Sequence, residues 1–291
     1  MSTNPSTPAH LTTNAHRTSA ADPASAASPA AVNAEFEGRV AIVTGGASGI
    51  GLATATLLAA RGARVAVLDR EIHNLPGGYL AIKADVTDDD AVKMAIATTA
   101  GSLGGIDILI NNAGIGAIGT VETNDDDEWR RVFDVNVFGM VRAARAAMPY
   151  LRAAAREKGQ AAIVNTCSIT ATAGLPDRAV YSASKGAVYS LTLAMAADHV
   201  REQVRVNCVT PGTVDTPWIG RLLAAAGDPE GERLALNARQ PLGRLVTADE
   251  VAAAIAYLAS PLAASVTGMA LAVDGGMNGL RVRPLPQAPA S

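Results

Sequence analysis

A tyrosine and a lysine stand four positions apart in the segment YSASK, at Tyr181 and Lys185. The surrounding residues 179–202 are rich in alanine, and their pattern predicts a helix. Side chains at positions i and i+4 share one face of a helix, so the ammonium group should lie near the phenol. A free phenol has a pKa of about 10, and a nearby positive charge favours its ionised form. The pair could therefore exchange a proton with a substrate, although a solvated surface pair has the same spacing.

A glycine-rich segment, TGGASGIG, spans Thr44–Gly51. It follows a short apolar run and opens a helical pattern, which is the context that a dinucleotide-binding turn requires. Glycines let the backbone approach a pyrophosphate, and the N-terminus of the helix offers free N–H groups to the phosphates. The spacing is G-x-x-x-G-x-G rather than the common G-x-G-x-x-G. The cofactor contacts predicted from this turn are Gly45, Ser48, Gly49, Ile50 and Gly51.

Polar residues stand at the ends of the next three predicted strands. Asp69 ends the second strand, where an acidic side chain can bind the hydroxyl groups of an adenosine ribose. A carboxylate there favours NAD over NADP, since it would repel the additional phosphate. A strand-end residue that caps a turn is the structural alternative at each position. Further cofactor contacts are predicted at Asp85, Val86, Asn112 and Gly114.

Strand-like and helix-like segments alternate from residue 37 to residue 280. The strands are nearly continuous apolar runs, which is typical of strands covered on both faces. Such alternation predicts an α/β fold, with a doubly wound parallel sheet flanked by helices in a single domain. We assign this domain to residues 36–282 and a short C-terminal tail to residues 283–291. Three local expectations follow: a helix capped by Thr87, one long helix over 126–157, and a less regular stretch over 217–240.

The composition limits the class of protein. The 291-residue chain has a net charge of −3, which argues against a nucleic-acid partner. The two cysteines, Cys167 and Cys208, fit a reducing compartment, and no apolar run is long enough to span a membrane. Residues 1–35 are rich in Ala, Ser, Thr and Pro and predict a disordered tail without a secretory core. His10 and His16 are too isolated to predict a metal site, so we expect a cytoplasmic protein without metal.

Several motifs together resemble the classical short-chain dehydrogenases/reductases over residues 37–280. These are the glycine turn, Ser168 thirteen residues before Tyr181, the Y-x-x-x-K pair, and three further segments. The further segments are NNAG at Asn111–Gly114, PGTVDTP at Pro211–Pro217 and VDGG at Val273–Gly276. The resemblance implies a Rossmann-type fold, NAD(P)-dependent interconversion of an alcohol and a carbonyl, and a homotetramer.

The resemblance also implies a role for particular residues. Tyr181 takes the hydroxyl proton while hydride leaves the carbon for the nicotinamide, and Lys185 also holds the nicotinamide ribose. Ser168 would bind the substrate oxygen, and Asn136 matches the asparagine that anchors a proton-relay water. Cys167, before the serine, is assigned to packing. The cofactor contacts added by the resemblance are Pro211, Gly212, Val214 and Thr216.

The substrate is predicted from a set of arginines. Arg178 lies three residues before Tyr181, and Arg221 and Arg239 lie in the stretch where the family has its substrate lid. Arginines beside a reacting centre favour an anionic or polyhydroxylated partner, although ordinary salt bridges also explain them. Trp218 could form an apolar wall against a sugar, or it could pack within the lid. The segments R-x-V-Y, PGTVDTP and RQ also resemble a subset of the family, the 3-hydroxybutyrate, sugar and 2-keto-3-deoxy sugar-acid dehydrogenases. This resemblance implies a small polar substrate: a sugar, a 2-keto-3-deoxy sugar acid or a hydroxy acid.

Two other functions are compatible with the same fold. The protein could be a 3-oxoacyl-thioester reductase, although such enzymes generally favour NADP. It could also be a non-catalytic nucleotide-binding protein. The intact set of Asn136, Ser168, Tyr181 and Lys185 argues against that possibility.

Overall fold

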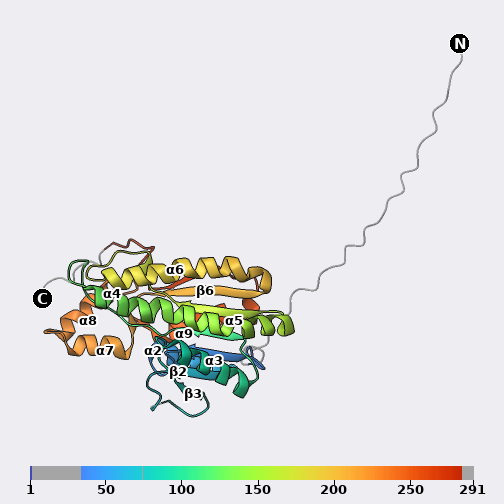
Figure 1. The fold of residues 1–291 in the computed structure, drawn as a ribbon. Helices are drawn as coiled ribbons and strands as arrows, with labels where there is room; N and C mark the ends of the chain where they lie inside the picture. Colours follow the sequence, from blue (N-terminus) through green and yellow to red (C-terminus); the bar gives the residue numbers. More distant parts are fainter. Residues whose placement is uncertain (2–33, 74, 284–291) are drawn as a thin grey trace.

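The computed structural model describes Met1 and residues 34–73 and 75–283. Within them, a seven-stranded sheet has the strand order β3-β2-β1-β4-β5-β6-β9. Figure 1 shows β2 and β3 towards one side of this sheet and β6 towards the other. Every neighbouring pair of strands is parallel, which confirms the predicted Rossmann-type α/β fold. The strands are β1 (Val40–Thr44), β2 (Arg64–Asp69), β3 (Leu80–Lys83), β4 (Ile108–Asn111), β5 (Ala161–Thr166), β6 (Val204–Pro211) and β9 (Ala270–Val273).

Helices cover both faces of the sheet. Ile42 and Val43 are consecutive residues of β1 and point into two different cores, because successive strand residues face opposite sides. The core around Ile42 packs against α3 (Asp89–Leu103), α5 (Gly139–Lys158) and α6 (Ala179–His199). The core around Val43 packs against α2 (Gly49–Ala60) and α9 (Ala248–Ala259). Strands buried on both sides explain the continuous apolar runs in the sequence.

The strand order reverses between β1 and β4. The chain moves outward from β1 through β2 to β3, and then returns to the other side of β1 to form β4. Thr44 at the end of β1 pairs with Asn111 at the end of β4, so the loops after both strands open at one edge. Open α/β sheets bind ligands in the crevice at such a switch point.

The predicted helix over 126–157 consists of three parts. α4 (Asp126–Phe133) is followed by a π-helical turn (Asp134–Phe138) and then by α5. A π-helical turn widens the helix by about one residue per turn, and such turns are frequent at functional sites. Apolar periodicity does not distinguish this turn from α-helix, so the sequence alone predicted one uninterrupted helix.

Residues 217–240, which were expected to be less regular, form two short helices. They are α7 (Pro217–Ala224) and α8 (Pro229–Ala238), and each begins with a proline at its first position. Proline there has a suitable φ angle and lacks an N–H that would be unpaired anyway. We call residues 217–240 the lid. A two-stranded sheet of β7 (Val214–Asp215) and β8 (Val246–Thr247) lies at its base.

The cap of α3 differs from the prediction by one residue. Asp88, rather than Thr87, accepts hydrogen bonds from the backbone N–H groups of Asp90 and Ala91. The Thr87 hydroxyl instead donates to Asp85 at 2.8 Å. Short 3-10 helices occur at Ile169–Ala171, Val200–Glu202 and Pro261–Ala263, so the end of the helix predicted over 179–202 is a 3-10 turn.

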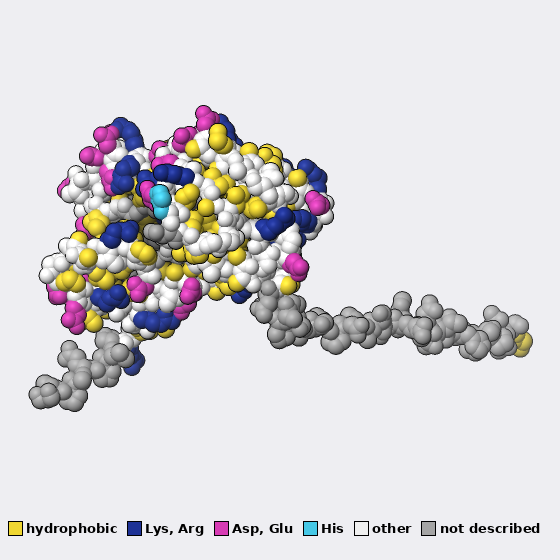
Figure 2. Space-filling model, turned by 90° about the horizontal axis from the view of Figure 1, so that it is seen from below, with side chains coloured by type: hydrophobic (Ala, Val, Ile, Leu, Met, Phe, Trp, Pro, Cys, Tyr) yellow, Lys and Arg dark blue, Asp and Glu magenta, His cyan; other side chains and the backbone are white. Residues whose placement is uncertain are grey.

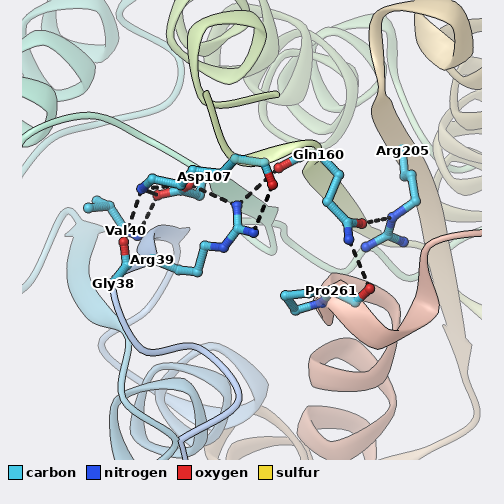
Figure 3. Close-up of polar contacts among 8 residues, drawn as sticks. Gly38, Arg39, Val40, Asp107, Gln160, Arg205 and Pro261 are labelled. Atoms are coloured by element: carbon cyan, nitrogen blue, oxygen red, sulfur yellow. Dashed lines mark hydrogen bonds and ion pairs between the residues drawn. The ribbon is translucent and has the colours of Figure 1, made fainter. Parts of the chain in front are cut away.

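A buried ionic network ties together the opposite, amino-terminal edge of the sheet. Asp107 precedes β4 and is 1% exposed. It accepts hydrogen bonds from the Val40 backbone at 2.8 Å, from Arg39 at 3.2 Å and from Lys158 at 3.0 Å (Figure 3). These contacts join the start of β1 to the end of α5. This edge therefore serves stability, while the loops at the other edge remain available for a ligand.

Arg205 continues this edge at the start of β6. Its guanidinium donates to the Gln160 side chain at 3.0 Å, and Gln160 donates in turn to the Pro261 carbonyl at 2.8 Å (Figure 3). It also donates to the carbonyl groups of Leu258 and Ser260 at the end of α9. Burial lowers the pKa of Arg205 to about 10. Arg205 thus binds the carbonyls at the C-terminal end of α9, where a positive charge is favourable.

Figure 2 shows acidic and basic side chains interspersed around the rim of one face, with hydrophobic and uncharged side chains between them. This face offers no continuous basic surface. In the described part of the chain, no helix is long and apolar enough to cross a membrane.

The predicted tails lie outside the described residues, except for Met1, Ala34, Glu35 and Arg283. Glu35 already forms an ion pair with Arg61 at 3.0 Å.

Candidate active site

A cavity of about 650 Å³ lies along the carboxyl ends of the strands. It extends from the glycine turn after β1 to the N-terminal part of α6 and to the lid. Most of the residues predicted for the site line this cavity, whereas Gly51 and Asn136 do not. The predicted residues that line it are Gly45, Ser48, Gly49, Ile50, Asp69, Asp85, Val86, Asn112, Gly114, Ser168, Arg178, Tyr181, Lys185, Pro211, Gly212, Val214, Thr216, Trp218, Arg221 and Arg239.

The glycine turn has the features of a phosphate-binding loop. Gly45 has a φ of 63°, and a Cβ there would lie 2.8 Å from Cα of Ala113. Ser48 caps α2 without a side-chain hydrogen bond, unlike Asp88 of α3, so the first N–H groups of α2 have no side-chain acceptor. Free N–H groups at a helix start are a ready site for phosphate. Gly51 instead packs against the carbonyl of Gly45, so its absent side chain serves the packing of the turn.

Asp69 lies at the far end of the cavity from Tyr181, at the end of β2. Its carboxylate accepts hydrogen bonds from the backbone N–H of Ala47 at 3.0 Å and of Glu71 at 3.2 Å. The next residue, Arg70, lies 3.8 Å from the carboxylate of Asp85. The acidic residues lining the cavity are Asp69 and Asp85, and both stand at this end.

Thr44, for which the sequence predicted no separate role, holds the loop after β4. Its hydroxyl oxygen accepts hydrogen bonds from the backbone N–H of Asn112 at 3.0 Å and of Ala113 at 3.1 Å. The Asn112 amide donates to the carbonyls of Thr44 and Gly45. The loops after β1 and β4 are therefore locked together. The sequence feature that could have predicted this contact is the threonine directly before the first glycine of the turn.

Tyr181 and Lys185 share one face of α6, as their spacing predicted. The Lys185 ammonium lies 5.7 Å from the centre of the Tyr181 ring. It is 3% exposed and donates to the carbonyl of Thr166 at 2.9 Å. No carboxylate lies within 4 Å of it in the described part of the chain. Burying a cation without an anionic partner is costly. The cost is offset if a nearby group such as the Tyr181 phenol becomes negatively charged during a reaction.

Asn136 is fully buried in the π-helical turn. Its side chain accepts a hydrogen bond from the Ile115 N–H at 2.8 Å and donates to the Ile115 carbonyl at 3.0 Å. It also donates to the hydroxyl of Ser184 at 3.1 Å, and Ser184 donates to the carbonyl of Tyr181 at 2.7 Å. Asn136 therefore connects the loop after β4 to the first turn of α6. Its side chain positions this backbone, and its predicted role with a relay water stays a prediction.

Ser168 follows β5 and faces the cavity. Its hydroxyl oxygen accepts a hydrogen bond from the N–H of Thr170 at 3.2 Å, which leaves the hydroxyl proton free to donate to a ligand. Cys167 is 2% exposed, and its thiol donates to the carbonyl of Lys185 at 3.2 Å. Cys208 is 1% exposed. Both thiols are buried, as expected for residues with a packing role.

Three arginines predicted to bind the substrate line the part of the cavity near α6 and the lid. Arg178 immediately precedes α6 and is half-buried, and its guanidinium donates to the carbonyl of Asp177 at 2.8 Å. Burial and the nearby guanidinium of Arg239 lower the pKa of Arg178. Arg221 and Arg239 belong to the lid and are exposed. In the described residues, none of the three lies within 4 Å of a carboxylate, which argues against a role in ordinary salt bridges.

Two further arginines line the cavity, namely Arg131 of α4 and Arg70, which follows β2. Arg131 already pairs with Glu128 at 2.8 Å. Trp218 is 40% exposed and lies against the backbone of Gly116 in the loop after β4. Its ring is thus shared between the cavity and this contact. Sequence patterns give no signal for a contact between residues so far apart in the chain.

The fold and the site together define a nucleotide-dependent oxidoreductase. A family model described as enoyl-(acyl carrier protein) reductase matches residues 45–278. The chain is 41% identical over 251 residues to cis-4-hydroxycyclohexanecarboxylate dehydrogenase of Sinomonas cyclohexanicum, covering 83% of this chain and 97% of that protein. The chain belongs to the short-chain dehydrogenase/reductase family, as its motifs predicted.

Two solved structures are similar over most of the chain. The ligand-free aldohexose dehydrogenase of Thermoplasma acidophilum has a TM-score of 0.80 and 35% identity, covering 87% of this chain and 99% of that one. The 3-ketoacyl-(acyl-carrier-protein) reductase of Brucella melitensis, solved with NADH, has a TM-score of 0.76 and 33% identity. The match covers 84% of this chain and 99% of the reductase chain. The family uses NAD(P). The glycine turn and the first N–H groups of α2, which have no side-chain acceptor, fit the phosphates of such a cofactor.

Proposed function

We propose that this protein is an NAD-dependent dehydrogenase that interconverts a secondary alcohol and a ketone on a small polar substrate. The observation that carries the proposal is the buried, unpaired ammonium of Lys185 beside the ring of Tyr181. When bound, the nicotinamide accepts or supplies hydride. The residues of the chain must then move the proton and hold the oxygen.

The proton step is assigned to Tyr181. Its phenol oxygen would take the proton of the substrate hydroxyl during oxidation and return it during reduction. Lys185 stabilises the negative charge that this transfer places on the phenol. The Ser168 hydroxyl donates a hydrogen bond to the substrate oxygen, and its other contact, to the N–H of Thr170, fixes its orientation. Asn136 keeps the loop after β4 and the start of α6 in register for this step.

The preference for NAD over NADP is assigned to Asp69. A phosphate on the adenosine ribose would meet this carboxylate, and like charges about 4 Å apart repel by about 4 kcal/mol at an effective dielectric constant of about 20. Arg70 could offset the repulsion, but it already lies 3.8 Å from Asp85. The charge arrangement around Arg70 therefore supports NAD.

The substrate is assigned to small hydroxy acids, sugar acids and sugars. Arg178 and the lid residues Arg221 and Arg239 line the cavity, while the acidic residues lining it stand at the other end, in the ribose region. A carboxylate or vicinal hydroxyls would give these guanidinium groups charge-assisted hydrogen bonds. One curated relative is named for a substrate that carries both a hydroxyl and a carboxylate. Trp218 would form an apolar wall beside the sugar or carbon skeleton.

A 3-oxoacyl-thioester reductase is the second candidate. It is favoured by the apolar residues Leu175, Leu222 and Leu236, which also line the cavity and could contact an acyl chain. The similarity to a 3-ketoacyl-(acyl-carrier-protein) reductase points the same way. The lid arginines and Asp69 weigh against it.

We also propose a cytoplasmic homotetramer, in keeping with the two free buried cysteines and with the small residues along α5 and α6.

A substrate screen tests this proposal. Purified protein is mixed with NAD or NADP and with sugars, sugar acids, hydroxy acids and neutral secondary alcohols, and the absorbance of the reduced cofactor is followed. We expect turnover with NAD and a hydroxy acid or sugar. Equal efficiency with NADP would overturn the role of Asp69. Exclusive reduction of long 3-oxoacyl thioesters with NADPH would move the second candidate to first place.

A further inference from the structure

The lid touches the body of the protein through Trp218 and Gly116. A Cβ added at Gly116 would lie 2.8 Å from Cζ2 of the Trp218 indole and 3.2 Å from Cε2. The indole therefore occupies the space that any side chain at position 116 would need. Gly116 follows Ile115, whose backbone is held on both sides by Asn136. The lid thus packs on a fixed part of the loop after β4.

The residue that precedes the lid makes a second contact on the other side of the crevice. A Cβ at Gly49 would lie 3.4 Å from Cγ2 of Thr216 and 3.9 Å from Cδ of Pro217. Gly49 is the first residue of α2, where the pyrophosphate of a dinucleotide would bind. Residues 216–218 therefore run across the switch-point crevice, from the start of α2 to the loop after β4. A dinucleotide in the crevice would lie beneath them.

The lid has a small hydrophobic core of its own. Ile219, Leu223 and Leu236 of the lid pack with Leu245, which follows the lid, in a cluster that is separate from the two large cores beside the sheet. An element with its own core can move as a unit without opening the main cores. Such movement would expose little of the apolar surface that stabilises the sheet.

The base of the lid is joined by one buried side chain. The Gln240 amide donates to the carbonyl of Thr213, before the lid, at 3.2 Å and to that of Arg244, after it, at 2.8 Å. The pairing of Val214 with Val246 lies beside these contacts. The two ends of the lid are therefore held together, and movement about this base would separate Trp218 from Gly116.

We propose that the contact between Trp218 and Gly116 is a latch that retains the bound dinucleotide and opens for its exchange. The inference rests on the proposed function in one respect, namely that the cavity binds NAD(H). The glycine is required because even one methyl group would displace the indole. The latch predicts that the rate of NADH release depends on how closely the Trp218 indole packs on the backbone at Gly116.

The test is a double-mutant cycle on NADH dissociation, followed by stopped-flow fluorescence with excess NAD as the displacing ligand. Gly116→Ala and Trp218→Ala should each raise the dissociation rate by about tenfold. In the Trp218→Ala background, Gly116→Ala should have no further effect, because the indole it displaces is gone. The matched control is Gly101→Ala, where a Cβ meets nothing within 4 Å. Unchanged dissociation in both single variants, or equal effects of Gly116→Ala in the two backgrounds, would overturn the latch.

A second measurement separates the latch from cofactor binding. The chain has two tryptophans, Trp129 and Trp218, so Trp129→Phe leaves Trp218 as the only indole. In that background without cofactor, Gly116→Ala should shift the emission to the red and increase quenching by acrylamide, since the indole leaves its contact. If this shift occurs and NADH does not bind, the proposed function fails while the contact stands. If no shift occurs, the latch is wrong whatever the cofactor does.

Discussion

The side chain of Asn136 pairs with the backbone of Ile115 as a strand would, accepting from its N–H at 2.8 Å and donating to its carbonyl at 3.0 Å. The same amide group donates to Ser184, which donates to the carbonyl of Tyr181. One buried amide thus links the loop after β4 to the start of α6. The amide can do this because it carries both a donor and an acceptor.

The first prediction tests that relationship. Asn136→Asp should lower kcat by at least about tenfold, because a carboxylate would face the Ile115 carbonyl and could not donate to it; such a loss costs about 1–3 kcal/mol. The melting temperature should fall as well. Activity assays and thermal unfolding check both expectations. Asn278→Asp, at an exposed position, should change neither, and normal kcat in Asn136→Asp would refute the positioning role.

The second prediction concerns the acid–base pair. Tyr181→Phe should lower kcat by about 10²–10⁴-fold and leave NADH affinity almost unchanged, because the variant lacks only the hydroxyl. Lys185→Met should reduce both kcat and NADH affinity. Steady-state kinetics and NADH titration distinguish the two patterns. Tyr189→Phe, two turns further along α6, serves as the control. If Tyr181→Phe kept near-normal turnover, another group would have to be the base.

The third prediction concerns substrate charge. Arg178→Met should raise KM for a hydroxy acid by about 10–100-fold, because the variant loses a charge-assisted hydrogen bond. Such a bond contributes about 1.5–3 kcal/mol. For a neutral secondary alcohol KM should change little. The control is Arg130→Met, an exposed arginine paired with Asp126 and Asp127. Equal effects on charged and neutral substrates would assign Arg178 to structure alone.

The fourth prediction separates stability from catalysis. Asp107→Ala should lower the free energy of unfolding by about 3–5 kcal/mol, because it leaves Arg39 and Lys158 without their buried partner. KM values should stay unchanged, since Asp107 lies at the edge of the sheet opposite the cavity. Urea unfolding and kinetics measure the two quantities. Asp127→Ala, which removes an exposed pair, should cost less than about 1 kcal/mol.

The fifth prediction concerns acid stability. Hydrogen bonds from Arg244 and from the backbone of Thr247 lower the pKa of Glu250 from its ordinary value of 4.5 to about 2. Because the folded pKa is depressed, this contribution is complete above about pH 4.5 and is lost as the pH falls towards 2. Between pH 4.5 and pH 2, the free energy of unfolding should therefore fall less in Glu250→Gln than in the unsubstituted protein. Parallel losses in the two proteins would show that Glu250 contributes nothing.

The sequence alone was enough to predict the alternation of strands and helices and the strand ends that carry polar residues. These features are local: burial on both faces makes Ile42 and Val43 both apolar, and an i, i+4 spacing places Tyr181 and Lys185 together. The glycine turn was equally readable, because its conformation requires glycine at Gly45. Family membership followed from the joint presence of the motifs.

Tertiary structure decided what depends on distant segments. The π-helical turn around Asn136, the role of Gly51 in packing and the order of the lid helices have no distinct apolar period. The contact between Gly116 and Trp218 joins residues about a hundred positions apart, and only packing brings them together. The same holds for Arg178 and Arg239, whose guanidinium groups become neighbours when the lid lies over the cavity. Local sequence encodes backbone preference, whereas these relationships arise from how the folded layers meet.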